Sequence, residues 1–163
     1  MKITVDPFDS KSIDKALKSL REYEKSLRAK ENELVRRLME IGVSVAETGF
    51  ATADYDGTND VLISWTQNGS RAAVIAYGET VGFIEFGTGV RYPEYDSSDI
   101  GYTPPPRGSY GKGHGKNPKG WYYVPNEGAA ATHTYGNPPA EAMLTARNEM
   151  IERVTQIARE VFG

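Results

Sequence analysis

The feature that most constrains the fold is a long amphipathic stretch over residues 12–46. Its apolar residues recur mostly at alternating steps of four and three, which places them on one stripe of a helix. They are Ile13, Leu17, Leu20, Leu27, Leu34, Leu38, Ile41 and Val45. At about 1.5 Å per residue such a helix is roughly 50 Å long, whereas a compact globule of this chain length is only about 40 Å across. We therefore expect part of the stripe to lie beyond the chain's own core, where a partner subunit would cover it.

Three residues inside this stretch depart from the stripe. Glu24 and Glu31 stand where the spacing calls for apolar residues, which argues against a fully buried seam. Gly42 costs a helix about 1 kcal/mol relative to alanine, so the helix is predicted to fray from this residue onward. At its beginning, Ser10 or Ser12 is predicted to provide the capping hydroxyl.

Composition narrows the class of protein. The chain has 163 residues, 39% of them hydrophobic, and a net charge of −3, which suit one domain with a slightly lean core. It has no cysteine, which excludes disulfides, thiolate metal sites and cysteine nucleophiles. Without a run of some twenty apolar residues or a signal-peptide core, we expect no membrane span and a protein that stays in the cytoplasm where it is made. The mild acidity predicts that any contact with DNA is local.

The hydrophobic period changes to two after the helix. Residues 50–78 contain three alternating runs, the first over residues 51–55, and Asn68-Gly69 between the last two is a strong hairpin signal. We expect three antiparallel strands here. Residues 79–86 fit either a short helix or a strand. The Gly87-Thr88-Gly89 that follows allows the backbone to turn or to approach another surface closely.

A long segment rich in glycine, proline and tyrosine comes next. Between Gly87 and Gly136 lie ten of the seventeen glycines, six of the nine prolines and seven of the ten tyrosines. Only residues 121–124 look like a strand. A loop of this length is usually functional or disordered, and its tyrosines argue against simple disorder. We expect it to be mobile in the isolated subunit and ordered on assembly.

Together these segments predict one α+β domain over residues 1–163. It contains the long helix at about 12–46, the β-meander at about 50–78, the loop at about 87–120 and a C-terminal helix at about 139–162 that Asn137 caps. Both helices are expected to pack on a small, mainly antiparallel β-sheet.

No motif in the sequence predicts a catalytic or metal site. His114 and His133 are the only histidines, and neither has a companion at metal-ligand spacing. Residues 111–116 look superficially like a phosphate loop, but Tyr110 stands where the first glycine is required and Asn117-Pro118 replaces the helix start. We expect no cofactor and no enzymatic activity. A hydrolase or nucleic-acid-processing enzyme remains as an alternative, which would unite a histidine with carboxylates.

A basic stretch runs from Pro106 to Gly120 and contains no acid. Its bases are Arg107, Lys112, Lys116 and Lys119. One interpretation is a solvated loop; the other is a contact with DNA phosphate or with an acidic face of a neighbouring subunit. Interleaved aromatic residues, including Trp121, favour contact.

The order of these elements resembles the tail-completion or head–tail joining (neck) proteins of long-tailed bacteriophages. Members of that family have an aliphatic-Glu-aromatic-Gly-Thr-Gly segment after the sheet, which matches Ile84-Glu85-Phe86-Gly87-Thr88-Gly89. They also have a proline-led opening of the last helix, which matches Asn137-Pro138-Pro139-Ala140-Glu141-Ala142-Met143. The similarity covers nearly the whole chain.

The resemblance implies a structural virion protein that forms a ring, expected to be a hexamer, around the DNA passage at the top of the tail. Implied partners are further copies of the chain, the head connector or head-completion protein, the tail terminator or tail-tube protein, and genomic DNA that passes without sequence recognition. The protein would be assembled in the host cytoplasm and reside in the virion. A tail terminator or minor capsid morphogenesis protein is the alternative. The candidate subunit-interface residues are Leu20, Leu27, Leu34, Phe86, Gly87, Thr88, Gly89 and Trp121.

Overall fold

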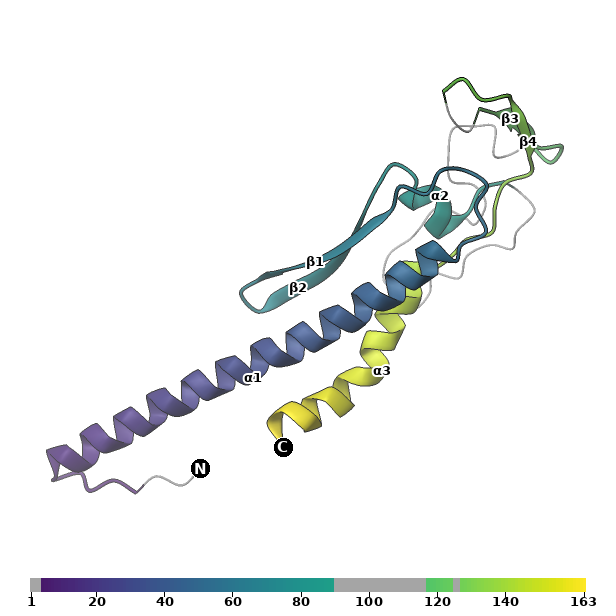
Figure 1. Cartoon of the computed structure of the whole chain (residues 1–163). Helices are drawn as coiled ribbons and strands as arrows, with labels where there is room; N and C mark the ends of the chain where they lie inside the picture. The colour runs from purple at the N-terminus through teal and green to yellow at the C-terminus, as the bar shows by residue number, and fades with distance from the viewer. Residues whose placement is uncertain (1–3, 90–116, 125–126) are drawn as a thin grey trace. The chain divides into compact units, whose positions relative to one another are not determined.

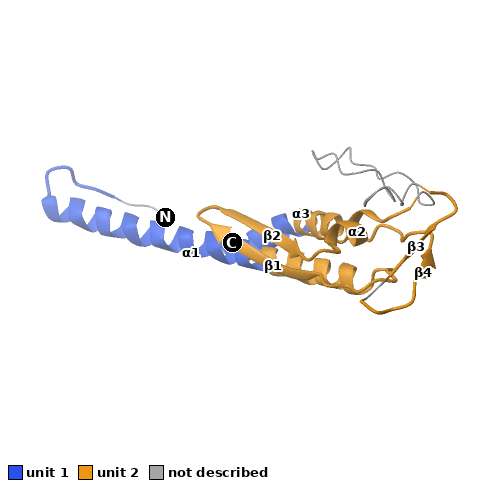
Figure 2. Cartoon of the chain, turned by 90° about the horizontal axis from the view of Figure 1, so that it is seen from above, with its two compact units in different colours: residues 1–38, 153–163 blue, residues 39–152 orange. Residues whose placement is uncertain are grey.

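The computed structural model describes residues 4–89, 117–124 and 127–163 (Figure 1). Its elements are, in order, α1 (Ser10–Ala51), β1 (Leu62–Asn68), β2 (Arg71–Tyr77), α2 (Val81–Phe86), β3 (Trp121–Tyr123), β4 (Thr132–Thr134) and α3 (Ala142–Phe162). The long N-terminal helix, the C-terminal helix and two small antiparallel sheets make the fold α+β, as predicted. The chain divides into two compact units, residues 1–38 with 153–163, and residues 39–152 (Figure 2).

Helix α1 is capped by Asp9. Its Oδ1 accepts the Lys11 N–H at 3.0 Å, and its carbonyl accepts the N–H groups of Ser12 and Ile13. The Ser12 hydroxyl instead accepts the Asp6 N–H at 2.9 Å. The predicted serine cap is therefore wrong, because an aspartate one residue before the helix satisfies its first free N–H groups.

The predicted fraying of the helix from Gly42 is also wrong, since α1 continues to Ala51. Both glycines near its end lie against other elements of the second unit. A Cβ atom on Gly42 would lie 2.7 Å from the Sδ of Met150 and 2.8 Å from a methyl group of Val74. A Cβ on Gly49 would lie 2.6 Å from that of Ala142. These glycines let α3 approach closely, and the resulting packing offsets their low helix propensity.

Two of the three predicted strands of the meander are present. Strands β1 and β2 pair antiparallel from Leu62↔Tyr77 to Asn68↔Arg71, and Gly69 has φ 60° in the predicted hairpin turn. The predicted strand at residues 51–55 is absent. Instead α1 continues to Ala51 and buries Phe50, which is only 2% exposed, and residues 52–55 form no strand.

The core of the second unit forms around Phe50, Ile84 and Ala142, which come from α1, α2 and α3. Partly buried residues from the connecting segments, from α2 and α3, and from β1 and β2 surround them. These are Ala53, Tyr55, Val61, Ile63, Ala76, Val81, Ala140 and Met143. Residues 81–86, which fitted two states in the sequence, form a helix because Ile84 is drawn into this core.

Strand β3 confirms the strand predicted near residues 121–124, and it pairs with β4 from Trp121↔Thr134 to Tyr123↔Thr132. Strand β4 was not predicted from the sequence. Most of the predicted loop lies outside the described residues, including Arg107, Lys112, Lys116 and His114.

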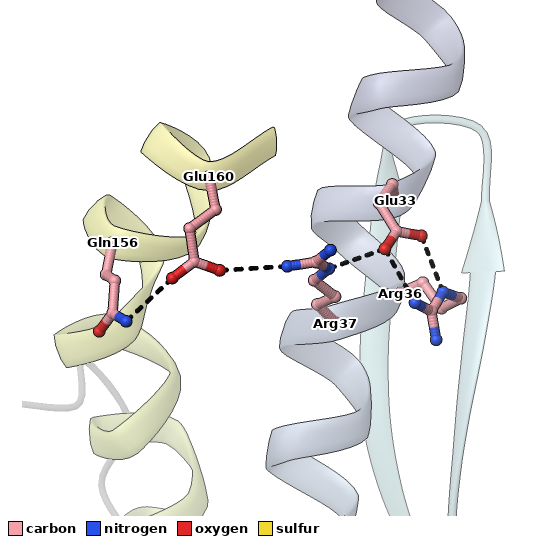
Figure 3. A network of polar contacts seen from close by, with 5 residues as sticks. All are labelled: Glu33, Arg36, Arg37, Gln156 and Glu160. Carbon is pink, nitrogen blue, oxygen red and sulfur yellow. Dashed lines mark hydrogen bonds and ion pairs between the residues drawn. The ribbon is translucent and has the colours of Figure 1, made fainter. Parts of the chain in front are cut away.

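The first unit contains the beginning of α1 and the end of α3, joined by polar contacts (Figure 3). Arg37 Nη1 donates to Glu160 Oε2 at 3.1 Å. Glu33 accepts hydrogen bonds from Arg36 at 2.9 Å and from Arg37 at 2.7 Å, and these bonds lower the pKa of its carboxyl to about 2. Further along, Lys30 Nζ lies 3.4 Å from the Phe162 carbonyl oxygen.

Candidate assembly interface

The first half of α1 carries a row of exposed apolar side chains. Five large ones are substantially exposed: Ile13 (39%), Leu17 (46%), Leu20 (50%), Tyr23 (47%) and Leu27 (38%). We call these five residues the α1 stripe. Leu20 and Leu27 were predicted to lie at a subunit interface, and the structure leaves both uncovered. The third helical candidate, Leu34, is half-buried.

Positive charge flanks the α1 stripe. Between residues 10 and 30 the helix carries seven bases and three acids. The bases are Lys11, Lys15, Lys18, Arg21, Lys25, Arg28 and Lys30; the acids are Asp14, Glu22 and Glu24. Glu24, one of the two acids in line with the stripe, is bound by Arg28 at 2.8 Å on the exposed surface. The surface is therefore apolar along one line and basic around it.

A second surface lies in the other unit, where α1 ends and β1 begins. It is an open hollow of about 300 Å³, lined by Glu47, Phe50, Ala51, Asn59, Val61, Leu62 and Ile63. Leu62, on this wall, is 71% exposed, and its strand partner Tyr77 is 50% exposed. The hollow was not predicted from the sequence. Its only signal was the consecutive run Val61-Leu62-Ile63, in which strand alternation must turn one apolar residue toward solvent.

Glu85, in the motif that carries the family resemblance, caps α3. Its Oε2 accepts the Met143 N–H at 3.0 Å, and its Oε1 accepts the Leu144 N–H at 3.3 Å. Burial raises the pKa of this carboxyl, although the backbone hydrogen bonds act in the opposite direction. The predicted Asn137 cap is wrong, because α3 begins only at Ala142 and the Glu85 carboxylate accepts two of its first N–H groups.

Asn137 joins the same motif in another way. Its Oδ1 accepts the Thr88 hydroxyl at 2.6 Å, its carbonyl accepts the Thr88 N–H at 3.0 Å, and its Nδ2 donates to the Phe83 carbonyl at 2.9 Å. Gly87 has φ 72°, and a Cβ there would lie 2.7 Å from the Pro139 nitrogen. The predicted close approach of this backbone is thus confirmed, and its partner is residues 135–139 of the same chain.

The remaining interface candidates divide by burial. Thr88, Gly87 and Gly89 are buried within the chain, and Phe86 is half-buried. Contacts within the same chain are enough to explain why these residues are buried. Their contact with another subunit stays a prediction.

The β3–β4 hairpin holds the other described candidates. Trp121 is half-buried, and Lys119 is exposed in the turn before β3. Beside them, the His133 ring lies edge-on between Tyr122 and Tyr135, with ring centroids 4.9 and 4.8 Å away. Its Nε2 is 3.1 Å from the Lys119 carbonyl oxygen, so the histidine is tied to the turn.

Asp60, which lies between the hollow-lining residues Asn59 and Val61, accepts several hydrogen bonds. It accepts the Glu79 N–H at 2.8 Å, the Thr80 N–H at 3.0 Å and the Thr80 hydroxyl, and these bonds lower its pKa. The Asp60 carboxylate therefore links the residues before β1 to those before α2 by hydrogen bonds.

Across residues 4–89, 117–124 and 127–163, no group of three or more His, Cys, Asp or Glu side chains is arranged to hold a metal ion. None of the helices in this described part is long and apolar enough to cross a membrane. Comparisons with protein-family models, with curated proteins and with solved structures gave no match. Within the described residues, the candidate site consists of two surfaces, the α1 stripe and the hollow.

Proposed function

We propose that this chain is a structural subunit of a tailed-bacteriophage virion, a ring-forming tail-completion or head–tail joining protein around the DNA passage. The observation that carries the proposal is the α1 stripe, a row of large apolar side chains that the chain itself leaves exposed. Such a row is typical of a protein surface that another protein covers.

The energetics of the α1 stripe support an assembly role. Full burial of one large aliphatic side chain contributes about 1.5–3 kcal/mol, and the stripe residues have about half of that still to gain. Over five residues this amounts to several kcal/mol, which helps to offset the entropy lost when subunits associate. The basic residues around the stripe add steering toward an acidic partner.

The family resemblance supports the more specific part of the proposal. The two matching segments, Ile84–Gly89 and Asn137–Met143, contact each other through Glu85, Thr88 and Asn137. In this chain the two segments that carry the resemblance help to fix where α3 begins. Neck subunits need a stable scaffold of this kind and exposed surface for their neighbours.

The test is removal of the gene from the phage that encodes the chain. We expect DNA-filled heads and complete tails that remain separate under the electron microscope, and joined particles once purified protein is added. Joined, infectious particles in the absence of the gene would refute the proposal.

Binding experiments separate the neighbouring assignments. Purified chain is expected to bind the head connector or head-completion protein as well as the tail side. Binding to the tail-tube protein alone would indicate a tail terminator, and incomplete heads after gene removal would indicate a minor capsid protein.

A further inference from the structure

A closed ring of identical subunits needs two different, complementary surfaces on each subunit. A surface that pairs with its own copy closes as a two-fold dimer, whereas a head-to-tail contact propagates and can close into a ring. The α1 stripe supplies one exposed surface, and the hollow near Leu62 supplies a second. Both are open in the single chain.

We propose that the α1 stripe of one copy docks over the hollow of the next copy, and that this head-to-tail contact builds the ring. The inference rests on the proposed function for its biological setting. It goes further by naming both faces of the contact and its polarity.

Apolar surface supports this pairing. The hollow has Phe50, Val61 and Ile63 in its walls, and Leu62 projects beside it with most of its surface exposed. The apolar side chains of the α1 stripe recur every three or four residues along a helix. They suit such a surface, because one helical face can lay several of them into an apolar groove.

Charge favours the hollow over a second α1 stripe as the surface that the stripe contacts. Residues 39–70, which provide all the walls of the hollow, carry five acids and no base. The acids are Glu40, Glu47, Asp54, Asp56 and Asp60. Glu47 lies in the wall of the hollow itself. The basic first half of α1 would therefore meet an acid there, whereas two stripes packed together would bring two basic surfaces into contact.

The proposed contact joins two copies. The last turns of α1 form one wall of the hollow. In the contact, the stripe that is laid over this hollow belongs to the next copy.

Disulfide trapping tests the proposal directly, since the chain contains no cysteine. We would introduce Leu20→Cys and Leu62→Cys together, both at exposed positions, and oxidise the concentrated protein. The expected result is a ladder of covalent multimers on a non-reducing gel, because each copy links to the next. The matched control carries Glu22→Cys with Leu62→Cys, which moves the thiol to the other side of α1, and we expect it to remain monomeric.

Mixing two single variants tests the polarity of the contact. A mixture of the Leu20→Cys and Leu62→Cys proteins is expected to stop at dimers that contain one chain of each kind. Dimers of Leu20→Cys with itself would show stripe against stripe and overturn the inference. Circular dichroism of each variant confirms that the fold is retained.

The outcomes separate this inference from the proposed function. Suppose that gene removal leaves heads and tails separate, but that no ladder forms in the concentrated protein or in joined particles. The proposed contact is then refuted, and the proposed function is retained. If the ladder forms but heads and tails join without the gene, the contact stands and the neck assignment falls.

Discussion

A single carboxylate connects the two sequence segments that characterise this chain. Glu85 is 5% exposed and accepts N–H groups from the first turn of α3. The partial positive charge at a helix N-terminus stabilises an anion there, which compensates part of the cost of burying it. Because burial still raises the pKa of Glu85, desolvation outweighs the hydrogen bonds.

Replacing Glu85 is expected to destabilise the protein in a graded way. Glu85→Ala leaves the N–H groups of Met143 and Leu144 without their acceptor and should cost about 1–3 kcal/mol in the free energy of unfolding. Glu85→Gln keeps one acceptor oxygen and should cost less. Urea unfolding at neutral pH measures both, with exposed Glu22→Ala as the control. Equal stability of Glu85→Ala and the control would show that the cap is dispensable.

Glu33 is expected to give the first unit an acid-sensitive contribution to stability. The guanidinium groups of Arg36 and Arg37 lower its pKa from 4.5 to about 2, so the folded state holds the proton less tightly than the unfolded state. The contribution is fully present above pH 4.5 and is lost as the pH falls toward 2. Thermal unfolding of wild type and Glu33→Gln between neutral pH and pH 2 should show a difference that disappears in this window. A difference that is constant with pH would contradict this assignment.

At the scale of elements, the second unit depends on close contact between the end of α1 and the beginning of α3. Small residues make it possible, since Ala46, Ala142 and Ala146 are all buried and the glycines leave no side chain in the way. Close packing of this kind tolerates added atoms poorly.

Gly49→Ala is expected to destabilise the protein although alanine is the better helix former. The new Cβ would lie 2.6 Å from the Ala142 Cβ and 3.0 Å from its Cα, which cannot move without shifting α3. The overpacking cost of about 1–3 kcal/mol should exceed the gain of about 1 kcal/mol in helix propensity. Gly42→Ala should be milder, because the atoms nearest to its new Cβ belong to the side chains of Met150 and Val74 rather than to the backbone, and Met150 is flexible. Urea unfolding measures both variants, with exposed Ser26→Ala as the control. A Gly49→Ala protein as stable as wild type would show that the new Cβ does not overpack the contact with α3.

Elements that depend on local contacts could be predicted from the sequence, and those that depend on distant contacts could not. The long helix, the Asn68-Gly69 hairpin and the strand near Trp121 depend on neighbouring residues, so periodicity and turn chemistry predicted them. The end of α1 could not be predicted, because Gly42 and Gly49 are explained by residues distant in the sequence, which are Val74 in β2 and Ala142 and Met150 in α3. The α3 cap was assigned to nearby Asn137 for the same reason, since Glu85 lies far back in the chain.

The candidate site shows the same limit. The exposed stripe was predictable, because its spacing is local and its length exceeds what one globule can cover. The hollow was not, since its walls come from the end of α1 and from residues 59–63, which only the tertiary fold brings together.

At the scale of the whole molecule, a net charge of −3 conceals a strong separation of charge along the sequence. Residues 10–30 contain four more basic than acidic residues, and every charged residue in the range 39–70 is acidic. In a chain that assembles head to tail, such a separation steers opposite faces together and keeps like faces apart. It also predicts that assembly weakens as salt screens the charges.

The last prediction concerns assembly without loss of folding. Leu27→Asp places a charge on the α1 stripe where the side chain is already partly exposed, so the free energy of unfolding should change by less than about 1 kcal/mol. Assembly should be lost, because the charge would have to be buried against a neighbour. Leu34 and Leu38 are both half-buried. Leu34→Asp and Leu38→Asp should therefore reduce stability as well as impair assembly. Circular dichroism melts measure folding, and counts of joined particles measure assembly. Ser26→Asp, beside the stripe, is the matched control and should assemble normally; a Leu27→Asp protein that joins heads to tails as well as this control would remove α1 from the interface.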